Sequence, residues 1–146
     1  MATRVDPYLG KNFNIAIENT PAISLSEVLG IETTIDVVDY REGTDLPNTV
    51  RKLPGLARYG NVILKRGFTQ DLSLWTWMYN NLSGQADRRQ AVITLFDQAG
   101  NTVLQWSIKN AWPCRWSGPE LRAESSDVAI ETLELCCESI IMTGPS

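Results

Sequence analysis

Histidines, cysteines and paired carboxylates carry out most side-chain chemistry, and this chain offers few arrangements of them. It has no histidine, which excludes Ser-His-Asp and Cys-His nucleophiles and the usual zinc sites. Its three cysteines, Cys114, Cys136 and Cys137, include no pair at the Cys-x-x-Cys spacing of a metal site. Carboxylates are plentiful, but no spacing marks any two of them for acid–base work. We therefore predict that the protein is not an enzyme and has no catalytic, metal or cofactor site.

The cysteines and the absence of targeting signals predict where the chain is made. The N-terminus lacks the apolar stretch of a signal peptide, and no apolar run reaches the roughly 20 residues of a membrane span. We expect synthesis in the cytoplasm, no direct membrane insertion of the monomer, and cysteines that are buried reduced thiols. No glycine-rich phosphate-binding motif occurs either.

The size and charge of the chain favour one globular domain over residues 1–146. Its net charge of −4 argues against a nucleic-acid backbone as partner. The charge is uneven: residues 1–119 carry 12 basic and 11 acidic residues, and residues 120–146 carry one and six. A near-neutral body with an acidic end suits head-to-tail stacking, although a solvated acidic strand would give the same pattern.

The sequence is organised around a long segment between two predicted strands. In residues 31–40 apolar and polar side chains alternate, which predicts a strand with one apolar face. A second short strand is predicted between Gly60 and Gly67. The intervening residues 41–59 show no period and contain Pro47 and Pro54, which predicts an unusually long loop.

This loop carries apolar residues that a solvated loop does not need. Leu46, Val50, Leu53 and Leu56 alternate with charges of both signs. Two interpretations remain open: an Ω-type loop folded on its own domain, or an arm, residues 41–58, that buries its leucines on another subunit.

The rest of the chain predicts strands and one helix. Residues 12–18, 88–96, 102–109 and 127–141 read as strands, with an irregular segment around Pro113. A helix is predicted at about residues 70–82, with Thr69 as its N-cap. Its expected buried face carries apolar residues at spacings of three and four: Leu72, Trp75, Tyr79 and Leu82.

This inventory predicts a mostly β fold. We expect an antiparallel β-barrel or sandwich of about six or seven strands, with one flanking α-helix and a long inter-strand arm. A monomeric ligand-binding β-barrel is an alternative, because small closed barrels can hold a ligand.

Several short motifs occur along the chain in a characteristic order and spacing. They are Tyr40-Arg-Glu-Gly43, Arg51-Lys-Leu-Pro-Gly55, Tyr59-Gly-Asn-Val-Ile-Leu-Lys-Arg-Gly67, Leu74-Trp-Thr-Trp77, Arg88-Arg89, Asn110-Ala-Trp-Pro113, Ser117-Gly-Pro119 and Ala129-Ile-Glu-Thr-Leu-Glu-Leu135. In this order and spacing they resemble the tail-tube proteins of contractile phages and phage-tail-like contractile injection systems. The resemblance runs from about residue 6 to residue 138.

The resemblance implies a structural subunit of an inner tube. Such protomers are expected to form stacked hexameric rings with a central channel through which cargo or DNA passes. Expected partners are further copies of the chain, a sheath protein, baseplate and tube-terminating proteins, and a cargo or tape-measure protein in the lumen. The particle that these proteins assemble into is expected to be a phage tail or an injection particle. A specialised ring beside the baseplate is an alternative within the same class.

The resemblance also suggests which residues meet other subunits. Because tube interiors are expected to be polar, we predict lumen-facing positions at Glu32, Thr34 and Asp36, on the strand predicted at residues 31–40. Candidates for contact with other subunits or rings lie along the arm: Arg41, Glu42, Asp45, Leu46, Val50, Arg51, Lys52, Leu53, Leu56 and Arg58.

Overall fold

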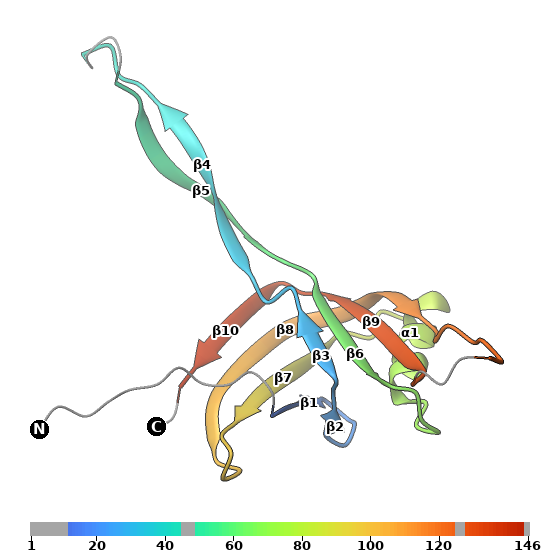
Figure 1. Cartoon of the computed structure of the whole chain (residues 1–146). Coiled ribbons are helices and arrows are strands. Elements are labelled where there is room, and N and C mark those ends of the chain that lie inside the picture. The colour runs from blue at the N-terminus through green and yellow to red at the C-terminus, as the bar shows by residue number, and fades with distance from the viewer. Residues whose placement is uncertain (1–11, 45–48, 125–127, 145–146) are drawn as a thin grey trace, which may run out of the picture.

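A curved antiparallel sheet forms the body of the protein, and a two-stranded arm projects from it (Figure 1). The computed structural model describes residues 12–44, 49–124 and 128–144. Seven strands of the body follow the order β2-β1-β7-β8-β9-β6-β3, and β10 adds to β8. Their bounds are β1 Phe13–Ile17, β2 Ile23–Ser24, β3 Glu27–Leu29, β6 Val62–Gly67, β7 Arg89–Phe96, β8 Thr102–Ser117, β9 Ile130–Cys136 and β10 Ser139–Thr143.

The prediction of a mostly β, antiparallel fold with one helix is confirmed, but the sheet is not a closed barrel. Its hydrogen-bonded order ends at β2 on one side and at β3 on the other. Within the part of the chain that the structure describes, no ladder joins these two strands. The sheet therefore bends around a core while keeping its ends open.

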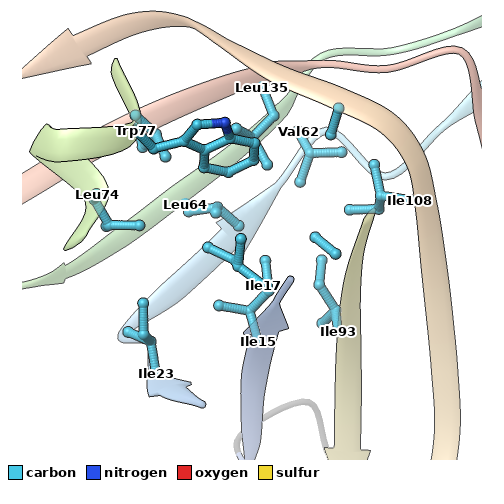
Figure 2. Packing of buried hydrophobic residues seen from close by; sticks show 13 residues of the cluster. Ile15, Ile17, Ile23, Val62, Leu64, Leu74, Trp77, Ile93, Ile108 and Leu135 are labelled. Atoms are coloured by element: carbon cyan, nitrogen blue, oxygen red, sulfur yellow. The ribbon is translucent and has the colours of Figure 1, made fainter. Parts of the chain in front are cut away.

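Alternating apolar residues from these strands meet in one core (Figure 2). Ile15 and Ile17 of β1 face Leu64 of β6 and Ile93 of β7, and each of the four is at most 3% exposed. Burial of each such side chain contributes about 1.5–3 kcal/mol. The concave side of the sheet is thus filled by side chains.

Helix α1, Ser73–Leu82, covers one side of the core with the face opposite to the predicted one. Leu74 and Trp77 are its buried residues. The prediction for Leu72, Trp75, Tyr79 and Leu82 is wrong, because these four side chains are exposed. The helix is apolar on both sides, so spacing alone could not decide which side meets the sheet.

The start of α1 also differs from the prediction. Thr69 does not cap the helix: its hydroxyl accepts a hydrogen bond from the Asp71 amide, in the turn before the helix. The Asp71 carboxylate instead accepts one from the Ser73 amide at 3.0 Å. Asp71 therefore satisfies one of the unpaired amides at the beginning of α1.

Strand β8 continues through the segment that was predicted to be irregular. Pro113 lies inside β8, where the pairing with β9 shifts register between Pro113 and Arg115. Such a bulge accommodates a residue that has no N–H to donate. The residues nearer the start of β8 pair with β7 on one side and with β10 on the other.

The single strand predicted at residues 127–141 is two strands in the structure, β9 and β10. The first pairs with the end of β8 and the second with its earlier part.

The predicted long loop is instead most of a β-hairpin. Strands β4, Thr33–Tyr40, and β5, Arg51–Tyr59, pair with each other as a separate two-stranded sheet. A register shift places one extra residue in β5 between Pro54 and Ala57, which hides the strand period in the sequence. Both strands of such a ribbon are edge strands, so Pro54 is tolerated.

Gly30 lies at the base of this hairpin. From here on, the arm means the whole hairpin, residues 33–59, which includes the segment 41–58 named in the prediction. The φ of +84° at Gly30 is strained for residues with a side chain, and an added Cβ would lie 2.1 Å from the carbonyl oxygen of Asn61. On the opposite strand, the Gly60 amide donates to the Glu32 carbonyl at 2.9 Å. The backbones at the foot of the arm are thus in close contact.

We predict that Gly30→Ala destabilises the protein by about 2 kcal/mol or more, because it adds a backbone clash to an unfavourable φ. Gly84→Ala is the matched control: Gly84 has a φ of +93°, but nothing lies within 4 Å of an added Cβ. Urea unfolding of the dilute protomer, followed by tryptophan fluorescence, measures both changes. Equal losses of stability in the two variants would contradict the role of close approach at Gly30.

Candidate subunit interface

The arm exposes apolar side chains, and no other segment among the described residues covers its ribbon (Figure 1). Ile35, Val37 and Leu56 are 59%, 64% and 71% exposed. Val38 pairs with Leu53 across the ribbon, and both are about half exposed. Because neighbouring residues of a strand point to opposite faces, Val37 and Val38 place apolar side chains on both faces of the arm.

Polar pairs within the arm hold the two strands in register. The Arg58 Nε donates to the Asp36 carboxylate at 2.9 Å, and the Thr33 hydroxyl donates to the Arg58 carbonyl at 3.1 Å. Arg51 and Glu42 form an ion pair at 3.8 Å near the distal end. Such exposed pairs contribute little stability each, so they set register more than they hold the arm together.

The structure places the predicted contact residues along this arm. Arg41, Glu42, Val50, Arg51, Lys52, Leu53, Leu56 and Arg58 are all exposed. Asp45 and Leu46 lie outside the described residues. The Ω-loop alternative does not fit, because the described part of the arm extends away from the body (Figure 1). Contact with another subunit stays a prediction at this point.

The predicted lumen residues also lie on the arm and not on the body. Thr34 and Asp36 are in β4, and Glu32 immediately precedes it. Glu32 and Thr34 are exposed, and Asp36 is half-buried by its pairing with Arg58. Their assignment to a tube lumen stays a prediction.

A second apolar surface, which we call the α1 patch, was missed by sequence reasoning. It consists of Leu72, Trp75, Tyr79 and Leu82 on the outer face of the helix. Tyr79 is 57% exposed, and its ring stands 6.2 Å from that of Trp75. The signal was present in the sequence: a helix with apolar residues on two opposite sides has more than one partner.

An apolar groove of about 270 Å³ adjoins the α1 patch. Trp75 and Trp116 form its wall, with ring centroids 4.8 Å apart in an edge-on arrangement. Phe68 and Leu72 complete the apolar lining, and the Asp71 carboxylate lies at the rim. The groove is open to solvent and rich in aromatic surface, which is typical of protein interaction sites.

A buried ion network fixes α1 and the groove to the sheet. Arg66 of β6 pairs with Glu131 of β9, and both side chains are at most 5% exposed. Arg66 also donates to the Asp71 carboxylate at 3.0 Å and to its carbonyl at 2.7 Å. The Trp116 indole N–H donates to Glu131 at 3.0 Å. One guanidinium thus connects two strands, the helix start and a groove tryptophan.

A second carboxylate holds the end of α1. Asp87 accepts two hydrogen bonds from Arg89, at 3.0 and 2.8 Å, and one from Asn80 at 2.9 Å. The buried Trp77 indole donates to the Asp87 carbonyl at 2.8 Å, and the Arg89 guanidinium lies 5.2 Å from the Trp77 ring centroid. Both ends of the helix are therefore tied to strands of the body.

These contacts shift the pKa values of both carboxyl groups. The hydrogen bond from Arg66 lowers the pKa of Asp71, and the Ser73 amide adds to the effect. The hydrogen bonds from Arg89 lower the pKa of Asp87 against the opposing effect of partial burial. Both groups are therefore more acidic than the ordinary carboxyl value of 3.8.

The cysteines are free thiols and are half-buried instead of fully buried. Burial, together with proximity to Cys136 and Glu134, raises the pKa of Cys114 to about 12. Burial likewise raises the pKa of Cys137. Two of the three thiols are thus held in the unreactive protonated form.

The described residues contain neither a metal-type cluster nor a membrane-spanning helix. No group of three or more acidic or cysteine side chains could hold a metal ion there. The one helix of this part is too short to cross a membrane.

We predict that Glu131→Ala destabilises the protein by about 3–5 kcal/mol, because it removes the buried partner of the Arg66 charge and leaves only Asp71, whose side chain is half exposed. Glu27→Ala is the control, since Glu27 pairs with Lys65 at the surface, one residue before Arg66 in β6. Its expected cost is at most about 1 kcal/mol. Urea unfolding of the two variants checks the difference, and similar costs would contradict the importance of the buried network.

The lowered pKa values predict acid sensitivity. A carboxyl group whose folded pKa is below its unfolded value adds stability above the unfolded value, and this is lost as pH falls through the folded pKa. The unfolding free energy should therefore decrease below about pH 4. Asp71→Asn should flatten this decrease, whereas Glu124→Gln, at an exposed loop carboxyl, should leave it unchanged. Urea unfolding at several pH values measures the slope, and an unaltered slope in Asp71→Asn would refute the assignment.

Comparison with known proteins places this geometry in a family. The T4-like virus tail tube protein gp19 family matches residues 10–141. No curated protein sequence matches the chain.

Solved structures share the whole fold. The sheath–tube complex of an extracellular contractile injection system, PVC, contains a chain with a TM-score of 0.84 and 25% identity, covering 95% of this chain and 93% of that one. A chain of the anti-feeding prophage baseplate has a TM-score of 0.79 and 27% identity, covering 99% and 98%. Hcp1 from Flavobacterium johnsoniae shares the fold at a TM-score of 0.58 and 16% identity, covering 92% and 96%.

The family match spans most of the chain, and solved tube-system structures match more than nine-tenths of it. The resemblance inferred from the motifs is thereby confirmed. The chain belongs to the T4-like tail tube family and is a tube protein of the kind found in phage tails and contractile injection systems.

Proposed function

We propose that this protein is a structural subunit whose copies form hexameric rings, and that the rings stack into a hollow tube through which cargo or DNA passes. The observation that carries the proposal is the arm, a two-stranded ribbon with apolar side chains on both faces that no other described segment of the chain covers. The role is structural and not catalytic.

The arm gains a stable structure only when another surface covers it. An isolated two-stranded hairpin is at best marginally stable in water. Burial of Leu53, Leu56 and Val37 on a neighbour would contribute about 1.5–3 kcal/mol each before the costs of association. Several such side chains per protomer suffice to offset those costs in a polymer with many repeated contacts.

The open sheet supplies the second kind of contact. Strand β10 pairs with β8 on one side, and its other edge is unpaired among the described residues. Open edges invite pairing with another chain. A repeated head-to-tail contact that closes on itself gives a ring, and strands from several protomers enclose a channel wide enough to stay open.

The lumen assignment of Glu32, Thr34 and Asp36 is part of this proposal. It requires the base of the arm to lie along the inner wall of the tube. At that base Thr34 and Asp36 alternate with Ile35 and Val37, so one face is polar and the other apolar. The polar face would meet the channel and the apolar face a neighbouring subunit.

The remaining partners follow from the settings of the similar structures. These include a PVC sheath–tube complex and an anti-feeding prophage baseplate. We propose that this tube is likewise enclosed by a sheath and continues into baseplate and terminating proteins, with cargo or a tape-measure protein in its lumen. The chain would be made in the cytoplasm and assembled into a phage tail or injection particle.

Two alternatives make different predictions. A specialised ring beside the baseplate is favoured by the 27% identity to a baseplate-complex chain, and it predicts few copies per particle instead of many. A monomeric ligand-binding barrel is disfavoured, because core side chains fill the concave side of the described sheet. Copy number in purified particles distinguishes the first alternative.

We predict that Leu53→Asp blocks stacking while leaving the protomer folded, because Leu53 is exposed on the arm and makes no contact with the body core. A buried charge at a contact costs several kcal/mol, so polymer yield should fall at least about tenfold. Negative-stain microscopy measures rings and tubes, and tryptophan fluorescence confirms the fold.

Gln98→Asp is the control, since it adds the same charge at an exposed turn away from the arm. It should assemble normally. Tubes of normal length from Leu53→Asp would refute the docking role of the arm, and a strictly monomeric wild-type protein at high concentration would refute assembly itself.

A further inference from the structure

We propose that Asn61 and Glu134 form a latch that fixes the angle at which the arm leaves the body. The latch lies beside a joint, residues 30–32 and 60–61, in the middle of one continuous hairpin. This inference rests on the proposed function, because the angle of the arm matters only if the arm meets a neighbouring copy. It assigns two positioning residues for that contact.

The arm and the strands below it are parts of the same hairpin. Leu29 of β3 pairs with Ile63 of β6, and Thr33 of β4 pairs with Tyr59 of β5. From the first pair to the second, each strand moves by four residues, so the register continues from the body into the arm without an insertion. Figure 1 shows the chain passing from β3 into β4, and from β5 back into β6, at the foot of the arm.

The hairpin is interrupted at the joint, where strand pairing stops. Between Leu29 and Thr33 no residue has a ladder partner on the opposite strand. A single backbone hydrogen bond, from the Gly60 amide to the Glu32 carbonyl, begins the pairing of the arm. Gly30 has a φ of +84° within this interruption. Residues at the ends of strands that absorb such backbone angles are typical of hinges.

Rotation at the joint has a large effect on the far end of the arm. Among the described strands, β4 and β5 pair only with each other, so no ladder holds the arm against the body. The nine residues of β5 span about 30 Å at about 3.3 Å per residue, so a turn of about 10° would move the far end by about 5 Å. This is about the spacing of neighbouring strands. A contact between copies therefore needs a fixed angle.

Contacts with β8, β9 and the residue after β9 hold one side of the joint to the body. The Asn61 Nδ2 donates to the Glu134 carboxylate at 2.9 Å and lies 3.9 Å from the Cys114 sulfur. The Cys137 thiol donates to the Gly60 carbonyl at 3.8 Å. Hydrogen bonds to a carboxylate are stronger than those between neutral groups, and thiol hydrogen bonds are weaker. The bond between Asn61 and Glu134 is thus the main tie.

Glu134 is a rigid anchor for this tie. It lies in β9, where it pairs with Ile63 of β6 on one side and with Arg115 of β8 on the other. Its neighbours Leu133 and Leu135 are fully buried in the core. A solvent-accessible hydrogen bond of this kind adds little to the stability of the body. Its effect is on geometry, because it connects a central strand to a joint that has few other contacts.

Distance measurements on the dilute protomer test the latch directly. Spin labels are attached through p-acetylphenylalanine at Lys52 on the arm and at Gln98 in the turn between β7 and β8, so the native cysteines stay in place. Pulsed electron paramagnetic resonance gives the distribution of distances between the labels. Glu134→Ala should at least about double its width, because only the weaker thiol contacts still tie the joint to the body. Asn61→Ala should do the same, and the double variant should be no broader than either.

Two further variants serve as controls. Glu134→Gln keeps a side-chain oxygen that accepts the bond from Asn61, so its distribution should be as narrow as that of the wild type. Glu18→Ala removes an exposed carboxylate after β1, which accepts a bond from the Gln90 amide at 3.1 Å, and should also leave the distribution unchanged. Equal broadening in Glu18→Ala and Glu134→Ala would indicate a general loosening of the body and would overturn the latch.

Polymer formation measures the use of the latch. An arm that adopts the docking angle only about a tenth of the time binds a neighbour about tenfold more weakly. Negative-stain microscopy should therefore show about tenfold less polymer for Glu134→Ala than for the wild type at the same concentration, and Glu134→Gln should assemble normally. Normal assembly of Glu134→Ala would overturn this use of the latch and leave tube assembly standing.

The outcomes separate this inference from the proposed function. An unchanged distance distribution in Glu134→Ala would overturn the latch, whatever the wild-type protein assembles into, because the measurement is made on the dilute protomer. A wild-type protein that has the narrow distribution but forms no rings or tubes would overturn the proposed function.

Discussion

A two-stranded ribbon has no third strand and no covering layer, so it cannot bury its own side chains. This constraint governs the molecule. Its body is an ordinary core of alternating strand residues closed by one helix, whereas the arm exposes apolar residues on both faces. A monomer would gain nothing from this surface, because exposed leucines and valines on an edge ribbon invite aggregation. We propose that association with further copies completes the folding of the arm in this member of the tail tube family.

The rest of the structure holds the two unfilled surfaces in fixed positions. Gly30 lets the chain leave the body at an angle that residues with side chains rarely adopt, with the Asn61 backbone in close contact. At the other end, Arg66 connects β6, β9 and the start of α1 through Glu131 and Asp71. A buried pair of this kind contributes little net stability over apolar packing, but it fixes geometry. Rigid placement matters in a polymer, because small angular errors accumulate from one ring to the next.

The sequence was informative where local pattern and burial agree. Local pattern predicted strands at residues 12–18, at 31–40, between Gly60 and Gly67 and at 88–96, and the structure confirms them as β1, β4, β6 and β7. The family resemblance predicted the overall class. It failed where the partner of a surface lies outside the chain. The second strand of the arm, β5, was predicted as part of a loop because Pro54 and an extra residue in β5 disrupt the period. The wrong face of α1 was assigned to the core because Trp75 and Tyr79 look as apolar as Leu74 and Trp77, and only packing decides between them.

Hydrogen exchange of the arm backbone tests the central claim, that the protomer is completed by its own copies. The amides of β4 and β5 are compared, by mass spectrometry, between dilute protomer and assembled tube, with β7 of the core as internal reference. The account predicts fast exchange of both arm strands in the protomer and protection approaching that of β7 in the tube. Arm amides that are equally protected in the dilute protomer, or that exchange equally fast in the tube, would contradict it.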